Sequence, residues 1–76
     1  MENITKKILT SAEFNTKYII KSIDTNNKEI EDFLFSLGCY EGEYITVISK
    51  ISDALVVTLK DARYSLNKEL ASCIFV

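Results

Sequence analysis

The fold of this chain is decided by the stretch Leu34-Phe35-Ser36-Leu37-Gly38-Cys39-Tyr40-Glu41-Gly42-Glu43-Tyr44-Ile45-Thr46-Val47, where the spacing of apolar residues changes. Ile30, Phe33, Leu34 and Leu37 recur at i, i+3, i+4 and i+7, which is the spacing of one helix face. From residue 44 onward apolar and polar residues alternate, which is typical of a strand. A helix therefore ends, and a strand begins, within this stretch.

The ends of the helix carry the expected signals. Asn26 or Asn27 can cap its N-terminus, and acidic residues 29, 31 and 32 lie where the helix dipole favours anions. Gly38 suits the left-handed residue that follows a helix, and Gly42 permits a second tight turn before the strand. These signals predict one helix that stops at Gly38.

The remaining segments predict short strands. Residues 18–23 are rich in β-branched and aromatic side chains, and alternation continues over residues 44–50, 54–60 and 63–66. Ser52-Asp53 and Asp61-Ala62 are the expected hairpin turns, Asn67 can cap a helical turn over 68–72, and residues 74–76 can form a last strand. Another short helical turn is expected around 10–13. This order predicts an all-β domain with one helix, arranged as a small, partly closed barrel of about five strands because closure removes exposed edges.

A core can be predicted from the inward positions of these segments. It comprises Ile20, Ile30, Phe33, Leu34, Leu37, Ile45, Val47, Leu55, Val57, Leu59, Leu66 and Ile74. The helix is expected to lie across an open end or face of the barrel.

Size and composition bound the function. The 76 residues, 47% of them hydrophobic, support one domain over residues 1–76, with residues 1–7 as a loose tail. The absence of histidine removes the commonest general base and neutral metal ligand, so an enzyme is not expected. A pI near 5.0 argues against nucleic-acid binding, where lysine and arginine supply most of the affinity.

The two cysteines do not predict a metal site. Cys39 and Cys73 lie far apart in the sequence without a CxxC pair, so we expect no metal, no cofactor and no disulfide. Cys73 is expected to be a buried packing residue, whereas Cys39 follows a glycine and could be exposed. No secretion signal and no apolar run of membrane-spanning length is evident, which predicts a cytoplasmic protein without membrane insertion.

Charge is uneven along the chain. Residues 1–28 carry a net charge of +2 from five lysines and three acids, and residues 29–43 carry −5 from five acids. Residues 44–76 carry +1, from four bases and three acids. An acidic side is therefore expected, either as a solvated face or as a docking patch.

Leu34, Leu37, Gly38 and Gly42, with the apolar positions around them, resemble the signature of the FeoA family, ferrous iron transport protein A. Residues 61–71 are similar to that family's hairpin and following turn, so the resemblance covers about residues 9–76. Glu41 stands where the family usually has proline. The resemblance implies an SH3-like β-barrel with the helix between strands 1 and 2 and a short helical turn before the last strand. It also implies a cytosolic accessory of FeoB, the GTPase-linked ferrous permease.

Three functional classes follow, of which a module that binds the cytoplasmic part of FeoB is favoured. The alternatives are an SH3-like domain of an iron-dependent transcription regulator and a small RNA-associated barrel. Recognition concentrates on loops held by a rigid scaffold, and aromatic and arginine side chains are enriched at interfaces. We therefore expect partner contacts from Cys39, Tyr40 and Glu41 in the loop after the helix and from Arg63 and Tyr64 in the hairpin. For the tyrosines, amphipathic packing in the barrel is favoured over contact with a partner. The sequence does not predict whether the chain self-associates.

Overall fold

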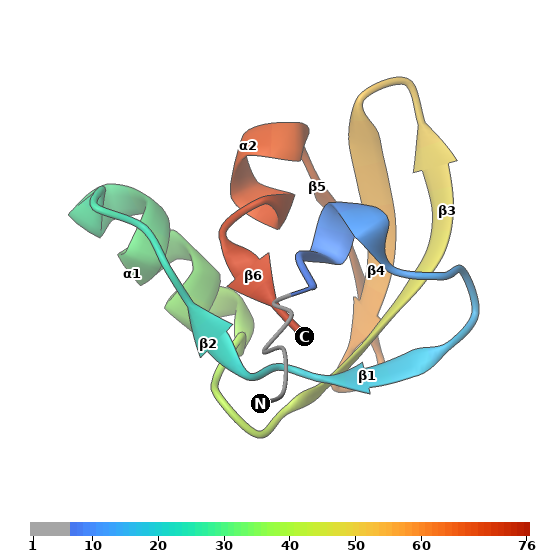
Figure 1. The fold of residues 1–76 in the computed structure, drawn as a ribbon, viewed down its shortest axis with the longest axis horizontal. Coiled ribbons are helices and arrows are strands. Elements are labelled where there is room, and N and C mark those ends of the chain that lie inside the picture. Colours follow the sequence, from blue (N-terminus) through green and yellow to red (C-terminus); the bar gives the residue numbers. More distant parts are fainter. Residues whose placement is uncertain (1–6) are drawn as a thin grey trace, which may run out of the picture.

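The computed structural model describes residues 7–76, in which short strands are accompanied by one main helix at the side of the molecule (Figure 1). The elements are η1 (Leu9–Ser11), β1 (Lys17–Ile19), β2 (Ser22–Ile23), α1 (Lys28–Leu37), β3 (Tyr44–Ile51), β4 (Ala54–Leu59), β5 (Ala62–Leu66), α2 (Lys68–Ala71) and β6 (Ile74–Phe75). This order confirms a mostly β domain with one main helix. The helical turn expected around 10–13 lies slightly earlier, as the 3-10 turn η1.

The strands form two antiparallel sheets. One has the order β1-β3-β4-β5, and the other pairs β2 with β6. Among the described residues, no ladder of hydrogen bonds joins the two sheets into a ring. The hydrogen bonding therefore does not confirm the partly closed barrel that the sequence predicted.

The segment predicted as one strand over residues 18–23 is divided between the two sheets as β1 and β2. Ile20 lies at the division with its side chain fully buried, and its N–H donates to the Glu43 carbonyl at 2.8 Å. The next N–H, of Lys21, donates instead to the Phe75 carbonyl at 2.7 Å. The backbone thus leaves β3 for β6 within two residues. The composition does not reveal this change because both halves have good strand formers.

Helix α1 begins and ends as its caps predict. The Asn27 side-chain oxygen accepts the N–H groups of Glu29 and Ile30 at 2.9 and 3.3 Å. Gly38 follows the last turn with φ of 102°, in the left-handed region. Both signals satisfy backbone groups that a helix terminus leaves unpaired.

The contact face of α1 is narrower than predicted. Leu34 is fully buried, and Ile30 and Leu37 pack partly against the core, but Phe33 is 47% exposed. Since each helical residue rotates by about 100°, Phe33 points well away from Leu34. The prediction that Phe33 belongs to the core is therefore wrong. In Figure 1 the helix lies beside β2, on the far side from the β3–β4 hairpin, and Leu34 is its one fully buried residue.

Strands β3, β4 and β5 form a meander with two-residue turns. The first turn is Ser52-Asp53, as predicted. The second is Lys60-Asp61 rather than Asp61-Ala62, so β5 begins at Ala62. Lys60 and Asp61 have φ of 53° and 67°, and positive φ at both residues is what a type I′ hairpin requires. Lysine is not a residue that favours this conformation, which is why the sequence misplaced the turn by one position.

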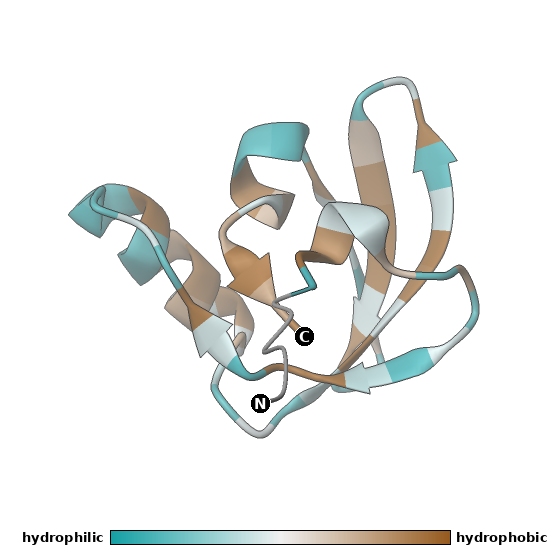
Figure 2. Ribbon diagram, in the orientation of Figure 1, coloured by the Kyte–Doolittle hydropathy of each residue, from teal (hydrophilic) through white to brown (hydrophobic). Residues whose placement is uncertain are grey.

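The core lies between the meander, α2, β6 and η1, and brown segments face this region in Figure 2. Alternating burial along β3 and β4 confirms the predicted inward positions, among them Ile45, Val47 and Val57. Five buried residues were absent from the predicted core: Leu9, Ala12, Cys39, Ala71 and Val76.

Most of the predicted loose tail, residues 1–6, lies outside the described residues. Lys7 is not loose, because its carbonyl accepts the Val76 N–H at 2.8 Å. Ile8 forms a bridge with Phe75, and the Lys7 ammonium lies 5.5 Å from the centre of the Tyr18 ring. Residues 7–8 therefore lie alongside β6.

Candidate functional site

The loop after α1 begins with a turn at Gly38. The Gly38 N–H donates to the Phe35 carbonyl and the Cys39 N–H to the Leu34 carbonyl, both at 3.0 Å. This pair of bonds is the Schellman motif, which requires a left-handed residue at the glycine position. The helix end is therefore fixed by backbone bonds.

A second turn follows at Gly42. The Glu43 N–H donates to the Tyr40 carbonyl at 3.0 Å and closes a four-residue turn. Gly42 occupies its third position with φ of 92°, as a type II turn requires. The Gly42 N–H also donates to the Ile20 carbonyl at 2.7 Å, which anchors the loop to the crossing between the sheets. Glu41 occupies the second position, where proline is common in such turns.

The Lys60 side chain crosses this loop from the β4–β5 turn. A Cβ atom at Gly38 would lie 3.2 Å from Cδ and Cε of Lys60, so the lysine stem packs on the glycine backbone. The Lys60 ammonium lies 3.4 Å from the Glu43 carboxylate and 5.5 Å from the centre of the Tyr40 ring. The Tyr40 ring stacks on Phe35 with centroids 5.8 Å apart. We call the contacts of Lys60 with Gly38, Tyr40 and Glu43 the Lys60 clasp.

The Lys60 clasp positions the loop more than it stabilises the domain. The side chains of Lys60 and Glu43 are 50% and 30% exposed, so water screens their attraction. A surface ion pair is typically worth about 0.2–1 kcal/mol, and an exposed cation–π contact about 0.5–1 kcal/mol. The loop and the hairpin turn consequently present one ordered surface.

The structure separates the predicted contact residues of the loop into two kinds. Tyr40 is 48% exposed and Glu41 is exposed, so both can reach a partner. Cys39 has no exposed surface and belongs to the core. Its side chain packs in the core under the loop and cannot contact a partner.

The two predicted hairpin residues also differ. Arg63 is exposed on β5, whereas Tyr64 is half-buried and packs against the core. Successive strand residues point to opposite faces, which explains this difference. The loop and the hairpin do lie close together, but the contact between them is made by Lys60 and not by Arg63 or Tyr64.

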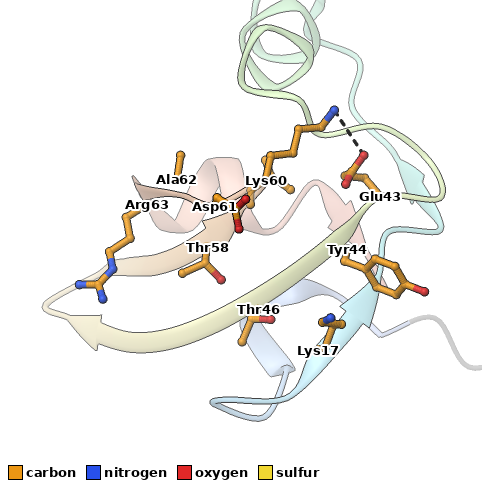
Figure 3. A pocket seen from close by; sticks show the side chains of 10 residues that line it. Lys17, Glu43, Tyr44, Thr46, Thr58, Lys60, Asp61, Ala62 and Arg63 are labelled. Carbon is orange, nitrogen blue, oxygen red and sulfur yellow. Dashed lines mark ion pairs between the residues drawn. The ribbon is translucent and has the colours of Figure 1, made fainter.

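A shallow groove of about 530 Å³ runs over the outer face of the four-stranded sheet beside the clasp (Figure 3). It was not predicted from the sequence. Its side chains are basic, acidic or hydroxylic for the most part: Lys17, Lys60, Arg63, Glu43, Asp61, Thr46, Thr58 and Tyr44. The alternation along residues 44–50 and 54–60 does indicate that Thr46 and Thr58 point outward. Arg63 pairs with Thr58 only when the turn is at Lys60-Asp61, because the turn sets the register of β5 against β4.

The prediction that Cys39 could be exposed is wrong, because Cys39 is buried. Cys73, predicted to be a buried packing residue, is half-buried and packs against the core, and neither cysteine forms a disulfide. Burial raises the pKa of the Cys39 thiol to about 11, because it disfavours the charged thiolate. Since the thiolate is the reactive and metal-binding form, Cys39 is inert at neutral pH. Within residues 7–76, no three acidic, cysteine or histidine side chains lie close enough together to hold a metal ion.

No helix within the described part of the chain combines the length and apolar character needed to cross a bilayer.

Comparison with known families decides the relationship. A family model described as the FeoA domain matches residues 8–76, which is nearly the whole chain. The chain belongs to the FeoA family. Membership confirms the resemblance based on Leu34, Leu37, Gly38 and Gly42, and the family is implicated in ferrous iron transport. No curated protein sequence gives a significant match to this FeoA-family chain.

Solved structures share the fold of this FeoA-family chain at low identity. FeoA of Stenotrophomonas maltophilia, an SH3-domain protein complexed with zinc, is 22% identical with a TM-score of 0.80, over 90% of this chain and 86% of that chain. The FeoA-like protein from Clostridium acetobutylicum is 21% identical with a TM-score of 0.83, over 96% and 86%. IdeR of T. acidophilum is 22% identical with a TM-score of 0.85. The match covers 100% of this chain but only 35% of the IdeR chain. These likenesses establish an SH3-like fold.

Proposed function

We propose that this chain is a non-enzymatic, cytoplasmic accessory protein of ferrous iron uptake that binds the cytoplasmic part of the FeoB permease. The observation that carries the proposal is the match of the FeoA domain to residues 8–76. Binding rather than catalysis is supported by a sequence without histidine and by a buried, neutral Cys39 thiol.

The contact surface comprises Tyr40 and Glu41 in the loop and Arg63 on β5. Tyrosine and arginine are enriched at the centres of protein interfaces. The two turns and the Lys60 clasp order the loop before it meets a partner, which lowers the entropic cost of binding. Cys39 and Tyr64, which face the core, act only by supporting this surface.

The proposal is tested by titrating the intact chain with the purified cytoplasmic part of FeoB and measuring the dissociation constant. Tyr40→Ala and Arg63→Ala should each weaken binding by about fivefold or more, the usual range for interface anchors. Phe14→Ala is the matched control for Tyr40, since Phe14 is 50% exposed and Tyr40 48%. Lys50→Ala is the control for the lost charge, because Lys50 is exposed near the other end of β3.

Both controls should bind normally and all four variants should keep their urea midpoints close to that of the intact chain. If the intact chain does not bind FeoB, the proposed function is wrong. If it binds and the two site variants bind equally well, FeoB meets a different surface.

A second candidate is an SH3-like interaction domain of an iron-dependent transcription regulator. It is favoured by the likeness to IdeR, at a TM-score of 0.85, and to a manganese-dependent transcriptional repressor, at 0.87. Under this alternative the stable partner is a DNA-binding protein. Cross-linking in the native host, with identification of the linked protein, separates a regulator from a permease.

A further inference from the structure

Four outward side chains form a straight row across the larger sheet. In the antiparallel registers, Lys17 pairs with Thr46, Thr46 with Thr58, and Thr58 with Arg63. Each residue comes from a different strand, in the order β1-β3-β4-β5. Figure 3 shows the four side chains along the groove, with Arg63 and Lys17 at the two ends of the row. We call this set the Lys17–Arg63 row.

The polar groups of the row have few partners within the molecule. Among the described residues, Arg63 makes no ion pair and the hydroxyls of Thr46 and Thr58 make no hydrogen bond. The Lys17 ammonium lies 4.9 Å from the centre of the exposed Tyr44 ring, which orients it without neutralising it. The row therefore offers two positive charges with two free hydroxyl groups between them.

The acidic side chains of the groove do not cancel these charges. Glu43 is paired with Lys60 at 3.4 Å. Asp61 lies in the β4–β5 turn, beyond the end of β5. Three bases face two acids in the groove, so its local charge is positive although the whole chain carries −2.

The spacing of the row matches an extended peptide. Four neighbouring strands are separated by three steps of about 4.8 Å, so Lys17 and Arg63 stand about 14 Å apart at their backbones. Residues i and i+4 of an extended chain point to the same side and are separated by about 13 Å. An extended segment that crosses the strands can thus place one carboxylate at each base.

We infer that the Lys17–Arg63 row binds an extended acidic segment of a partner protein, with two carboxylates four residues apart. Lys17 and Arg63 bind the carboxylates, and the hydroxyls of Thr46 and Thr58 hydrogen-bond to main-chain groups between them. The inference rests on the proposed function insofar as the segment belongs to FeoB. The row lies beside the Lys60 clasp, since Lys60 and Glu43 line the same groove.

A nucleic-acid strand fits the row less well than an acidic peptide. Single-stranded binding combines a basic groove with several aromatic side chains on which successive bases stack. Tyr44 is the one aromatic side chain lining this groove within residues 7–76, so the groove offers a single stacking position.

The first test uses synthetic peptides and does not require FeoB. Two seven-residue peptides contain two glutamates each among glycine and serine; in one the glutamates are four positions apart, and in the other they are adjacent. Nuclear magnetic resonance titration of the intact chain at low salt should shift the signals of residues 17, 46, 58 and 63. The spaced peptide should bind roughly two- to fivefold more tightly than the adjacent one, the range of one exposed charge pair.

Variants assign the contacts. Arg63→Gln and Lys17→Gln should each weaken binding of the spaced peptide by about two- to fivefold and abolish its advantage over the adjacent peptide. Thr46→Val and Thr58→Val keep side-chain shape and strand propensity, and should weaken both peptides alike. Lys50→Gln, away from the row, should leave both affinities unchanged.

The outcomes separate the inference from the proposed function. Binding of the spaced peptide at the row, with no binding of FeoB, supports the inference and overturns the proposed function. FeoB binding that is unaffected by Lys17→Gln, with no peptide shifts at the row, overturns the inference alone. Tighter binding of a polyuridine oligonucleotide than of the spaced peptide at the same residues would replace the acidic segment with RNA.

Discussion

Replacing Gly38 with alanine tests the Lys60 clasp. Gly38 and Gly42 have φ of 102° and 92°, so alanine is strained at both positions by a similar amount, about 1–3 kcal/mol. Their surroundings differ. A Cβ atom at Gly38 would lie 3.2 Å from Cδ and Cε of Lys60, whereas nothing lies within 4 Å of one at Gly42. The difference in free energy of unfolding between Gly38→Ala and Gly42→Ala therefore reports the contact with Lys60, because the backbone strain is common to both variants.

The size of this difference follows from what Lys60 must give up. To make room for a methyl group, its stem must shift by a few tenths of an ångström, which lengthens the contacts of its ammonium with Glu43 and Tyr40. An exposed ion pair contributes about 0.2–1 kcal/mol and an exposed cation–π contact about 0.5–1 kcal/mol. Because half of the Lys60 side chain is in water, we expect Gly38→Ala to be about 1 kcal/mol less stable than Gly42→Ala.

Urea unfolding of both variants, each also combined with Lys60→Ala, completes the test. In the Lys60→Ala background the difference between the two glycine variants should shrink to within about 0.5 kcal/mol, the error of additivity for uncoupled sites. Any effect of Lys60→Ala on the stability of the hairpin turn is present in both double variants and cancels in the difference between them. Equal stabilities of Gly38→Ala and Gly42→Ala with Lys60 present would refute the clasp.

Three further predictions concern the core, the buried thiol and the loop. Leu34→Ala should lower the free energy of unfolding by about 2–5 kcal/mol, because Leu34 is fully buried, whereas Phe33→Ala should cost under about 1 kcal/mol; urea midpoints check both. The pKa of Cys39 is about 11 in the folded chain, and an unfolded thiol ionises near 8.5. The stability that the neutral Cys39 thiol contributes is therefore complete below about pH 8.5 and is lost as the pH rises to 11. The intact chain should therefore lose about 2–3 kcal/mol more than Cys39→Ala between pH 8 and 11, measured by urea unfolding at both pH values, with Cys73→Ala behaving like the intact chain. Glu41→Pro should raise stability by about 0.4–1 kcal/mol in a thermal or urea melt, because Glu41 has the second position of the type II turn and its N–H makes no hydrogen bond within the described residues. A loss of stability in Glu41→Pro would mean that the turn is of another type.

The parts of the fold that the sequence predicted correctly depend on local chemistry. The Asn27 cap, the Gly38 stop and the alternation of Ile45 and Val47 each follow from backbone bonds or from the period of one element. The division of the first strand at Ile20 does not, because it depends on which distant carbonyls, those of Glu43 and Phe75, lie within reach. The width of the helix contact face, and hence the exposure of Phe33, depends likewise on tertiary packing.

The candidate site was predicted in part for the same reason. Tyr40 and Arg63 were selected by residue type and position in loops, and both are exposed. Cys39 was misjudged because a residue after a helix stop can point to either side, and here it points into the core. Lys60 was missed because its role requires positive φ at a lysine, for which the sequence carries no signal.

The pairing of β2 with β6 has a consequence for the order of folding. Ser22 pairs with Phe75 across about 50 residues, whereas the strands of the meander are joined by two-residue turns. Loop-closure entropy grows as the logarithm of loop length, so this pairing costs roughly 2 kcal/mol more to close than a hairpin. We therefore expect the meander to form early and the β2–β6 ribbon late, and we expect the ribbon to open before the meander in the folded protein. Amide protons of Lys21 and Asp24, which bond to Phe75 and Cys73, should exchange with solvent well before those of β4.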